Sequence, residues 1–588
     1  MRSASALLVL IVAFASAVGA ACASSPSEQP FAHDGGGGGA SSGGGSGSGG
    51  GSPDATVGAD GSMAGPDGGG VGPADGSTTD GPISFGGGWQ IPDAGTQPPL
   101  VGDGGTTVVI GPGAGNGSPG AFGGSNTAAG PQIVYPPDGV LVPPNTFGLE
   151  FHFIPGPGQT LFRFTFQAPT TTLVVYTGCT PVNGGCVYAP DPTFWSSLVA
   201  YARGTQPVTF SVTGVDGQSP GATGTSATQS IAFADQDMTG GIYYWNTQGV
   251  IQRFDYALPD AGVENYLTPP DVGAAFCVGC HVISRQGYRI VAGKDIPSPA
   301  PYSVLDVPTK QPLKVNGQPV AGSANFFSFS PDQQHLLTSD GVSVSWLELA
   351  TGKVHAAVAP SGTMPDWSPD GQHMVYAQPS SPSPFPLPGV SSASIATMHF
   401  DGWGWDTPTT LVPFAGQNDY YPTFSPDGQW VLFNRSPSNA ESFSNAAPDP
   451  DAGTLPDGEL WAVSAAGGTP VRLGAASDPG ACSWPKWAPV MHDYYGGKIM
   501  WLTFSSQRAY GLRLSQWQGT QIWMAAFDPA RIASGQDPSF PAFWLPFQDI
   551  TGGNHIAQWS EAVQRASCTV SSDCPSREMC VRGQCVPG

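Results

Sequence analysis

The sequence is poor in charged residues, and basic residues are the scarcer kind. Only 11% of its 588 residues are charged, and 20 Lys and Arg stand against 43 Asp and Glu, a formal net charge of −23. A surface of this sign repels phosphate backbones, which argues against nucleic acid as a partner. Long apolar runs are also lacking. After residue 21, no segment is long and apolar enough to span a bilayer.

The first 21 residues are the exception. Arg2 precedes "ALLVLIVAFASAV" and then "GAAC", which is the order of a secretory signal peptide and is too short for a membrane span. The segment resembles bacterial lipoprotein signals, in which a cysteine at the place of Cys22 is lipidated, although Gly19 stands where leucine is usual. The resemblance implies an exported protein of a Gram-negative bacterium, in the periplasm, the outer membrane or on the cell surface. Its membrane contact would be a lipid anchor, and simple cleavage with release is the alternative.

Glycine and proline, in contrast, are abundant, with 83 and 60 residues. Much of this bias lies between residues 22 and 130, which include "GGGGGASSGGGSGSGGGS". Such a segment has too little apolar surface to offset the entropy of ordering the chain, so we predict a disordered, flexible linker.

A β-sandwich is predicted for residues 131–240. Short β-rich runs such as "TLFRFTFQA", "TTLVVYTG" and "VTFSVTGVDG" alternate with Pro and Gly turns, which is typical of an antiparallel sandwich of the immunoglobulin or fibronectin type III kind. Cys179 and Cys186 flank "TPVNGG" and are expected to form a disulfide in an oxidising compartment. Nothing in this region indicates catalysis.

An internal repeat determines the fold predicted for residues 241–566. "FFSFSPDQQHLLTS", "MPDWSPDGQHMVYA" and "YPTFSPDGQWVLFN" each place an aromatic residue, a Ser-Pro-Asp turn and alternating apolar residues in the same order. Counting weaker copies gives six, and their anchor positions are Ser284, Ser330, Ser368, Ser425, Ala488 and Ser560. We therefore predict an all-β, six-bladed propeller whose last blade is completed by an N-terminal pair of strands at 241–258.

The Ser-Pro-Asp-Gly repeats resemble those of TolB-like propellers of bacterial periplasmic proteins. The resemblance implies the architecture and leaves the function open, since propellers serve in binding, transport and catalysis. The chain leaves no room for the α/β-hydrolase domain that some peptidases carry beside such a propeller, so an electron carrier or a binding protein is favoured over a hydrolase. After the propeller, residues 567–588 hold four cysteines that predict a two-disulfide knot: Cys568, Cys574, Cys580 and Cys585.

The stretch "AAFCVGCHVISRQG" carries the most specific chemistry. Its C-x-x-C-H order, at 277–281, is the attachment signature of a c-type haem, in which two thiols bind the porphyrin and the histidine binds iron. We predict haem attachment at Cys277 and Cys280, with His281 as the proximal ligand. "TPPDVGAAF" before it is expected to form a short helical turn, similar to the presentation of the motif in cytochromes c.

Alignment of the repeats places this motif at one mouth of the central channel. When the repeats are aligned so that Ser284 matches Ser368, Cys280 matches Met364. In the other copies, Trp484 and Ile556 occupy the equivalent position. The second axial ligand would then be Met364 or His555, or the position would be open. Met364 as channel packing and His555 as a hydrogen-bonded channel residue are the structural alternatives.

Two other interpretations of the cysteine pair remain open. One is a disulfide between Cys277 and Cys280 with no cofactor; the other is a zinc or copper site of Cys277, Cys280, His281 and Cys482. The sequence thus predicts an electron-transfer protein with a redox partner. The alternative is a scaffold that binds envelope proteins, with contacts from Tyr420, Tyr421 and Trp484.

Overall fold

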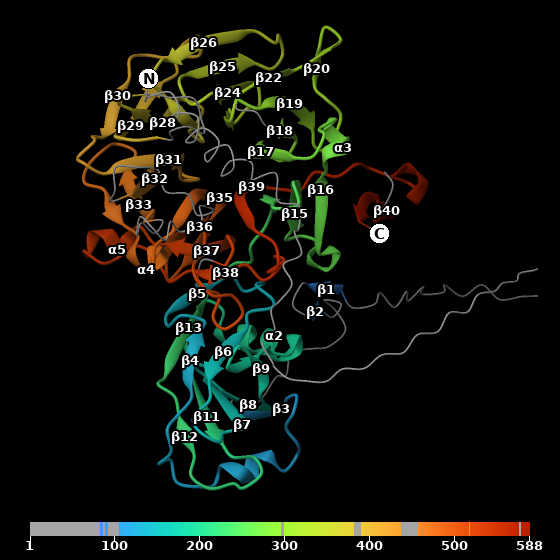
Figure 1. Cartoon of the computed structure of the whole chain (residues 1–588), viewed down its shortest axis with the longest axis vertical. Helices are drawn as coiled ribbons and strands as arrows, with labels where there is room; N and C mark the ends of the chain where they lie inside the picture. Colours follow the sequence, from blue (N-terminus) through green and yellow to red (C-terminus); the bar gives the residue numbers. More distant parts are fainter. Residues whose placement is uncertain are drawn as a thin grey trace, which may run out of the picture. The chain divides into compact units, whose positions relative to one another are not determined.

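A computed structural model describes residues 83–85, 89–91 and 105–588, apart from 296–298, 382–389, 437–456, 517, 575–577 and 588. The predicted signal peptide, Cys22 and most of the predicted linker lie outside the described residues. The described chain is almost entirely β-structure (Figure 1). Its first two strands, β1 (Ile83–Phe85) and β2 (Trp89–Ile91), pair with each other.

Two sheets face each other in the sandwich. One sheet contains, in order, β4 (Gln132–Tyr135), β6 (Phe151–Ile154), β10 (Gly185–Tyr188) and β9 (Thr180–Val182). The other contains β3 (Thr106–Ile110), β8 (Thr172–Gly178), β7 (Leu161–Gln167), β11 (Val208–Val215), β13 (Gln229–Phe233) and β5 (Val140–Val142), with β12 (Gly224–Thr225) on β11. Phe153 of the first sheet meets Phe162 of the second with ring centroids 4.7 Å apart. This aromatic core confirms the predicted sandwich.

The sandwich differs from the prediction in three respects. Two of its strand pairs, β3–β8 and β13–β5, are parallel rather than antiparallel. Strand β3 lies inside the range 22–130 predicted as linker, because its alternating "TTVVI" pairs along the edge of β8. The sheets are joined by an unexpected helix, α2 (Pro192–Ala202), which begins where the Asp191 carboxylate accepts hydrogen bonds from the amides of Thr193 and Phe194.

Six four-stranded sheets form the propeller (Figure 1). Blade 1 contains β17 (Val278–Ile283), β18 (Arg289–Lys294), β19 (Pro301–Asp306) and β22 (Ala321–Ser323). Blade 2 contains β23 (Phe326–Phe329), β24 (His335–Ser339), β25 (Val344–Glu348) and β26 (Val354–Ala359). Blade 3 contains β27 (Thr363–Trp367), β28 (His373–Pro379), β29 (Ala393–His399) and β30 (Thr409–Val412).

The remaining blades complete the circle. Blade 4 contains β31 (Asn418–Phe424), β32 (Trp430–Ser436), β33 (Glu459–Ser464) and β34 (Val471–Arg472). Blade 5 contains β35 (Cys482–Tyr494), β36 (Gly497–Ser506), β37 (Gln521–Phe527) and β38 (Phe543–Trp544). Blade 6 contains β39 (Asn554–Ser560), β14 (Gly241–Asn246), β15 (Val250–Asp255) and β16 (Val263–Leu267). The six-bladed prediction is confirmed, and blade 6 has a third N-terminal strand, β16, beyond the predicted pair.

Short elements fill the connections. They are the strands β20 (Lys314–Val315), β21 (Gln318–Pro319), β40 (Glu578–Val581) and β41 (Gln584–Pro587), the helices α3 (Pro269–Val272), α4 (Gly474–Ser477) and α5 (Ala530–Ala533), and the 3₁₀ turns η1 (Ser118–Phe122), η2 (Pro259–Ala261) and η3 (Ser571–Asp573). None of the helices in the described part of the chain has the length and apolar character needed to cross a bilayer.

The Ser-Pro-Asp turns join the first two strands of their blades. The Ser368 hydroxyl donates to the Asp370 carboxylate at 2.5 Å and accepts from the amide of His373 at 2.8 Å. Ser330 and Ser425 make the same pair of contacts in blades 2 and 4. The repeat is therefore a hydrogen-bonded turn that sets where each second strand begins.

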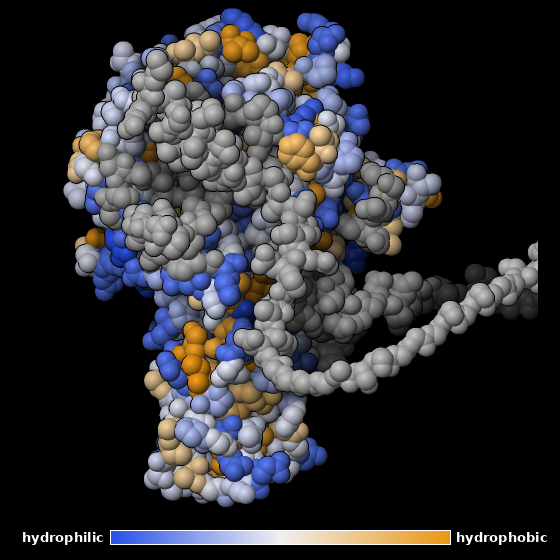
Figure 2. Space-filling model, in the orientation of Figure 1, coloured by the Kyte–Doolittle hydropathy of each residue, from blue (hydrophilic) through white to orange (hydrophobic). Residues whose placement is uncertain are grey.

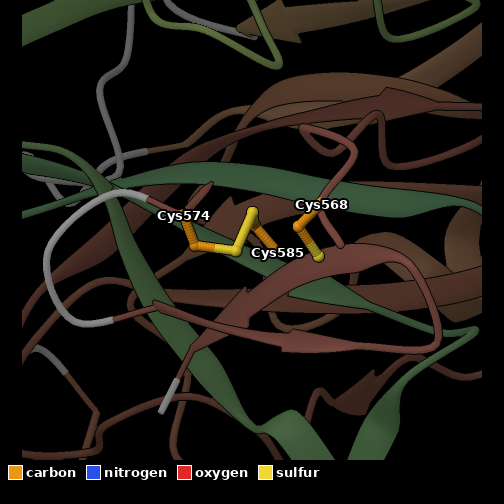
Figure 3. Close-up of side chains that lie close together, drawn as sticks. All are labelled: Cys568, Cys574 and Cys585. Carbon is orange, nitrogen blue, oxygen red and sulfur yellow. A yellow bond between two sulfur atoms is a disulfide. The ribbon is translucent and has the colours of Figure 1, made fainter. Parts of the chain in front are cut away.

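Disulfides join Cys179 to Cys186, Cys568 to Cys580 and Cys574 to Cys585. The last two confirm the predicted knot and give the connectivity that spacing alone leaves open. Figure 3 shows the bond between Cys574 and Cys585. Such bonds are typical of a protein that folds in an oxidising compartment, as expected for an exported chain.

A buried ionic cluster joins the loop before β6 to the segment after β36. Glu150 accepts hydrogen bonds from His152 Nε2 and the Tyr510 hydroxyl, both at 3.0 Å, and from two guanidinium nitrogens of Arg513. Burial alone would raise the pKa of Glu150, but the bonds from His152 and Arg513 lower it to about 2. The carboxylate is therefore charged at any physiological pH and holds sandwich and propeller residues together.

Candidate functional site at the channel mouth

The six innermost strands form a ring in which each contacts the next: β17, β23, β27, β31, β35 and β39. In five of them the residue four places before the anchor has a positive φ, namely Cys280 (46°), Met364 (54°), Tyr421 (51°), Trp484 (54°) and Ile556 (59°). The pairing register shifts beside each of these residues, as at a β-bulge. The structure thus places Cys280 level with Met364, Trp484 and Ile556, as the repeat alignment predicts.

Aromatic side chains at this level pack against one another. We name Phe326, Met364, Tyr421 and Trp484 the mouth cluster. The rings of Tyr421 and Trp484 stack with centroids 4.1 Å apart, and Phe326 lies 6.1 Å from Trp484. The sulfur of Met364 accepts the amide hydrogen of Tyr421 at 3.4 Å. Met364 is thus used in channel packing, the structural alternative to haem ligation.

The C-x-x-C-H residues lie on a strand rather than on a helix. The expected helical turn forms as α3 (Pro269–Val272), with Asp271 closing its first turn onto Thr268. It ends before the motif, and the Asp295 carboxylate then accepts the amides of Ala275, Phe276 and Cys277. Strand β17 begins one residue later.

Cys280 and His281 point to different neighbours. Cys280 packs against the core between blades 1 and 2, which includes Val291 and Phe327. His281 faces blade 6, where its Nε2 lies 3.2 Å from the carbonyl oxygen of Tyr243. The two side chains diverge at a bulge in β17, where Cys280 has a φ of 46°. Burial raises the pKa of the Cys280 thiol to about 11, so it is protonated at neutral pH.

Two buried histidines face each other across the inner strands of blades 1 and 6. His281 is 4% and His555 6% exposed. Nδ1 of His281 and both ring nitrogens of His555 have no hydrogen-bond partner. Burial lowers the pKa of His281 to about 4, and burial together with the neighbouring His281 lowers that of His555 to about 3. Trp245 packs edge-on to His555 at 4.5 Å, and its own ring nitrogen is unpartnered.

The alternative interpretation, a disulfide between Cys277 and Cys280, is wrong. Cys277 is disulfide-bonded, whereas Cys280 and Cys482 are free thiols. The divergent side chains of β17 explain this outcome, because Cys280 turns toward blade 2.

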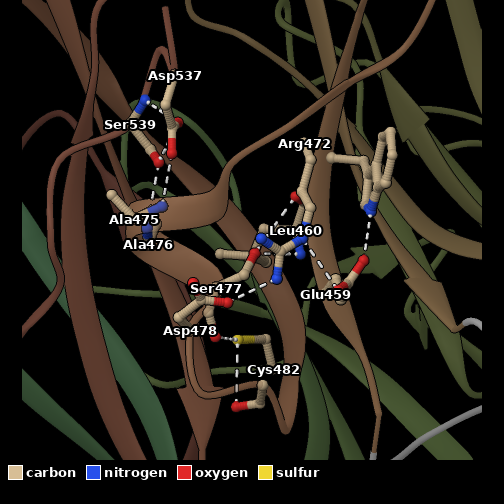
Figure 4. Close-up of polar contacts among 12 residues, drawn as sticks. Glu459, Leu460, Arg472, Ala475, Ala476, Ser477, Asp478, Cys482, Asp537 and Ser539 are labelled. Carbon is tan, nitrogen blue, oxygen red and sulfur yellow. Dashed lines mark hydrogen bonds and ion pairs between the residues drawn. The ribbon is translucent and has the colours of Figure 1, made fainter.

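The predicted Cys₃His metal site is not assembled either. The sulfur of Cys482, at the start of blade 5, lies 3.4 Å from the carbonyl oxygen of Ser477 in α4 (Figure 4). It also accepts a hydrogen bond from Arg508 at 3.1 Å. Within the described ranges, the one group of three potential metal ligands within 4.8 Å is Cys568, Cys574 and Cys585, which are in disulfides and offer no thiolate (Figure 3).

The residues present do not fit a covalently attached haem in this conformation. A c-type haem needs both thiols and the imidazole on one side of the chain. Here Cys280 and His281 lie on opposite sides of β17, and Cys277 is already in a disulfide. The donor chemistry of His281 and His555 is nevertheless that of axial haem ligands.

The exposed residue Trp403 was not predicted from the sequence as a functional residue. Trp403 is 89% exposed at the tip of the hairpin between β29 and β30. The Asp401 carboxylate accepts the amides of Trp403 and Gly404, both at 2.8 Å, so the tip is well ordered. Trp405, two residues on, packs on Trp367 with centroids 5.1 Å apart. The signal in the sequence is "DGWGWD", a turn flanked by two tryptophans.

No model of a known protein family matches the chain, and no curated protein matches it. Among solved structures, a putative TolB from Agrobacterium tumefaciens is 15% identical with a TM-score of 0.31, over 55% of this chain and 99% of that one. TolB from Acinetobacter baumannii is 11% identical with a TM-score of 0.30, over 79% and 96%. A putative 6-phosphogluconolactonase from Bacteroides fragilis is 12% identical with a TM-score of 0.24, over 54% and 95%.

The chain is a six-bladed β-propeller with a β-sandwich. Its own sheets show this, and likenesses of such low identity and TM-score carry no argument about function.

Proposed function

We propose that the chain is an exported scaffold that binds other envelope proteins through its propeller. The observation that carries the proposal is Trp403, a large aromatic side chain held almost fully in solvent by an ordered hairpin. Figure 2 shows hydrophilic residues over much of the coloured surface, with hydrophobic residues gathered in separate groups. A tryptophan in this setting has the features of an interface anchor, since anchors are enriched in Trp.

The hairpin favours binding because it is organised before any partner arrives. Asp401 holds the tip, and the carbonyl of His399 accepts the amide of Asp406 at the base. Little conformational entropy is then lost on binding apart from that of the Trp403 side chain itself. The exposed face of the indole offers apolar area, and its ring N–H offers one hydrogen bond.

A photo-crosslinking experiment tests the proposal. A benzophenone amino acid is placed at Trp403 and, as a control, at Val354, which is 60% exposed in blade 2. We expect a discrete adduct with one envelope protein from position 403 and none from 354. The purified partner should then bind Trp403→Ala at least about tenfold more weakly, roughly 1.4 kcal/mol, and Val354→Ala unchanged. Equal binding by all three proteins would refute the assignment of Trp403.

A c-type haem with an electron-transfer role is the second candidate. Two observations favour it: the order of Cys277, Cys280 and His281, and the unpartnered nitrogens of His281 and His555. Attachment requires that a dithiol reductant first open the disulfide of Cys277, because each thioether uses one thiol, and that β17 turn so that Cys280 and His281 face one side. The haem would supply a one-electron centre, and the two imidazoles would hold its iron.

Absorption spectroscopy separates the two candidates. The protein is expressed with a c-type haem maturation system, and a denaturing gel is stained for haem. Stain that persists in the wild type and disappears in Cys277→Ala, with a reduced α band, would establish the haem. A colourless wild-type protein would leave the scaffold as the function.

A further inference from the structure

Blade 3 carries a pair of exposed histidines on adjacent strands. His373 begins β28, His399 ends β29, and the two are direct partners in the antiparallel register. Their ring centroids are 5.2 Å apart, with 65° between the ring planes. The His373 side chain is 41% exposed, and His399 is also exposed, so both rings are accessible to ions in solvent.

The other blades show that this pair is unusual. At the equivalent cross-strand position, blade 1 pairs Arg289 with Asp306 and blade 2 pairs His335 with Glu348. Each of those pairs joins a basic residue to an acid, which stabilises adjacent strands. Blade 3 instead places two basic rings opposite each other, and two protonated rings would repel. A cation shared between two neutral imidazoles would turn this contact into an attractive one.

The geometry of the pair suits one metal ion. Two imidazoles bound to one tetrahedral ion, with metal–nitrogen bonds of about 2.0–2.1 Å, place their ring centroids about 5 Å apart. Asp370 lies beside His373, although its carboxylate and the two imidazoles do not form a group of three within 4.8 Å. Its Oδ1 is held by the Ser368 hydroxyl and the amide of Gln372, while Oδ2 lies 3.9 Å from Nδ1 of His373.

The surroundings are acidic. The carboxylate of Asp406 accepts the amide of His399 at 2.8 Å, and Asp401 lies in the adjoining turn. The Asp401 carboxylate accepts the amides of Trp403 and Gly404 and adds to the negative charge near the pair. A cation is therefore attracted to the same edge of blade 3 that carries the two rings.

We infer that His373 and His399 bind one Zn²⁺ or Cu²⁺ ion between their two imidazoles, with water completing the coordination. Imidazole nitrogen favours these ions over Mg²⁺ and Ca²⁺, which prefer all-oxygen sites. The site is independent of the motif at Cys277 and of the function proposed above.

Calorimetric titration of the tag-free mature protein with Zn²⁺, and electron paramagnetic resonance with Cu²⁺, test the inference. We expect one ion per chain and at least tenfold weaker binding in His373→Gln and in His399→Gln. His335→Gln, the equivalent position in blade 2, is the matched control and should bind like the wild type. Mg²⁺ should give no heat of binding at the same concentrations.

The Cu²⁺ spectrum adds a readout that depends on the ligands themselves. Coupling to two imidazole nitrogens is expected in the wild type and to one in either single variant. Circular dichroism of each variant shows whether the propeller is still folded. Unchanged affinity in a folded His373→Gln/His399→Gln double variant would overturn the inference, as would a wild type that binds no ion.

Discussion

Substitution of His555 tests whether its buried ring nitrogens bind a ligand in the mature protein. Both nitrogens are unpartnered, and the ring packs against Trp245. Leaving a buried polar group without a hydrogen bond costs about 1–3 kcal/mol. His555→Phe keeps an aromatic ring in contact with Trp245 and removes both nitrogens. Allowing for the slightly larger ring, we expect the free energy of unfolding to rise by about 1 kcal/mol at pH 7.5.

The same substitution should change the response to acid. The folded-state pKa of His555 is about 3, below the usual value of 6.5 for a solvated histidine. Between these values the unfolded chain binds the proton and the folded chain does not, so stability falls as the pH is lowered from 6.5 toward 3. At pH 4.5 this one residue removes roughly 3 kcal/mol, because each pH unit below the solution pKa costs a little over 1 kcal/mol. The advantage of His555→Phe should therefore grow to about 3–4 kcal/mol at pH 4.5.

Scanning calorimetry at pH 7.5 and pH 4.5 measures both effects. For a propeller of this size we expect the variant to unfold roughly 2 °C higher at pH 7.5 and several degrees higher at pH 4.5. His355→Phe is the control, because His355 has a partner, with Nε2 lying 2.8 Å from the Glu348 carboxylate, and should give no stabilisation. A lower transition temperature for His555→Phe at pH 7.5, with no widening in acid, would refute the reasoning. It would mean that a ligand satisfies the nitrogens of His555, as the haem candidate requires.

Substitutions at two further positions test the packing around the site and the contact between the two β-domains. Glu150→Gln removes the charge that binds Arg513, so we expect a loss of about 2–4 kcal/mol, measured as a lower transition temperature at pH 7. Because the pKa of Glu150 is about 2, below the solution value of 4.5, the wild type should lose this contribution as the pH falls from 4.5 toward 2, and Glu150→Gln should not. Met364→Ala should cost about 2–5 kcal/mol by opening a cavity beside Tyr421, whereas Met364→Leu should cost less than about 1.5 kcal/mol. An equal loss from both Met364 variants would indicate that the sulfur has a role beyond packing.

The blades were predictable from the sequence because each copy carries its own turn chemistry. Local hydrogen bonds join Ser368 to Asp370 and to the start of β28, so the Ser-Pro-Asp motif by itself predicts a hairpin. The alignment also predicted that Cys280, Met364 and Trp484 occupy equivalent positions on the innermost strands. Each lies the same number of residues before its anchor, and equal spacing places residues at the same distance along the channel. Strand β3 could not be found in this way, since it is one short strand at the end of a Gly-rich segment and is ordered by pairing with β8.

The motif at 277–281 could not be interpreted from its letters alone, because its chemistry depends on the backbone that carries it. On a helical turn, closely spaced cysteines and a following histidine can converge on one group. On β17 the positive φ of Cys280 and the alternation of the strand send its thiol toward blade 2 and the imidazole of His281 toward blade 6. Spacing in the sequence records which residues are near one another along the chain, and only the secondary structure decides whether they share a face.

The contrast between the two histidine pairs follows from the same reasoning. His281 and His555 are buried with unpartnered nitrogens, so they reduce stability in acid unless a ligand occupies them. His373 and His399 are exposed, and their separation already suits a shared ion. The C-x-x-C-H signature drew attention to the first pair, whereas the second lies within an ordinary repeat, where the other blades serve as its comparison. A substitution at His399 and one at His555 should therefore change different properties: ion binding in the first case and acid stability in the second.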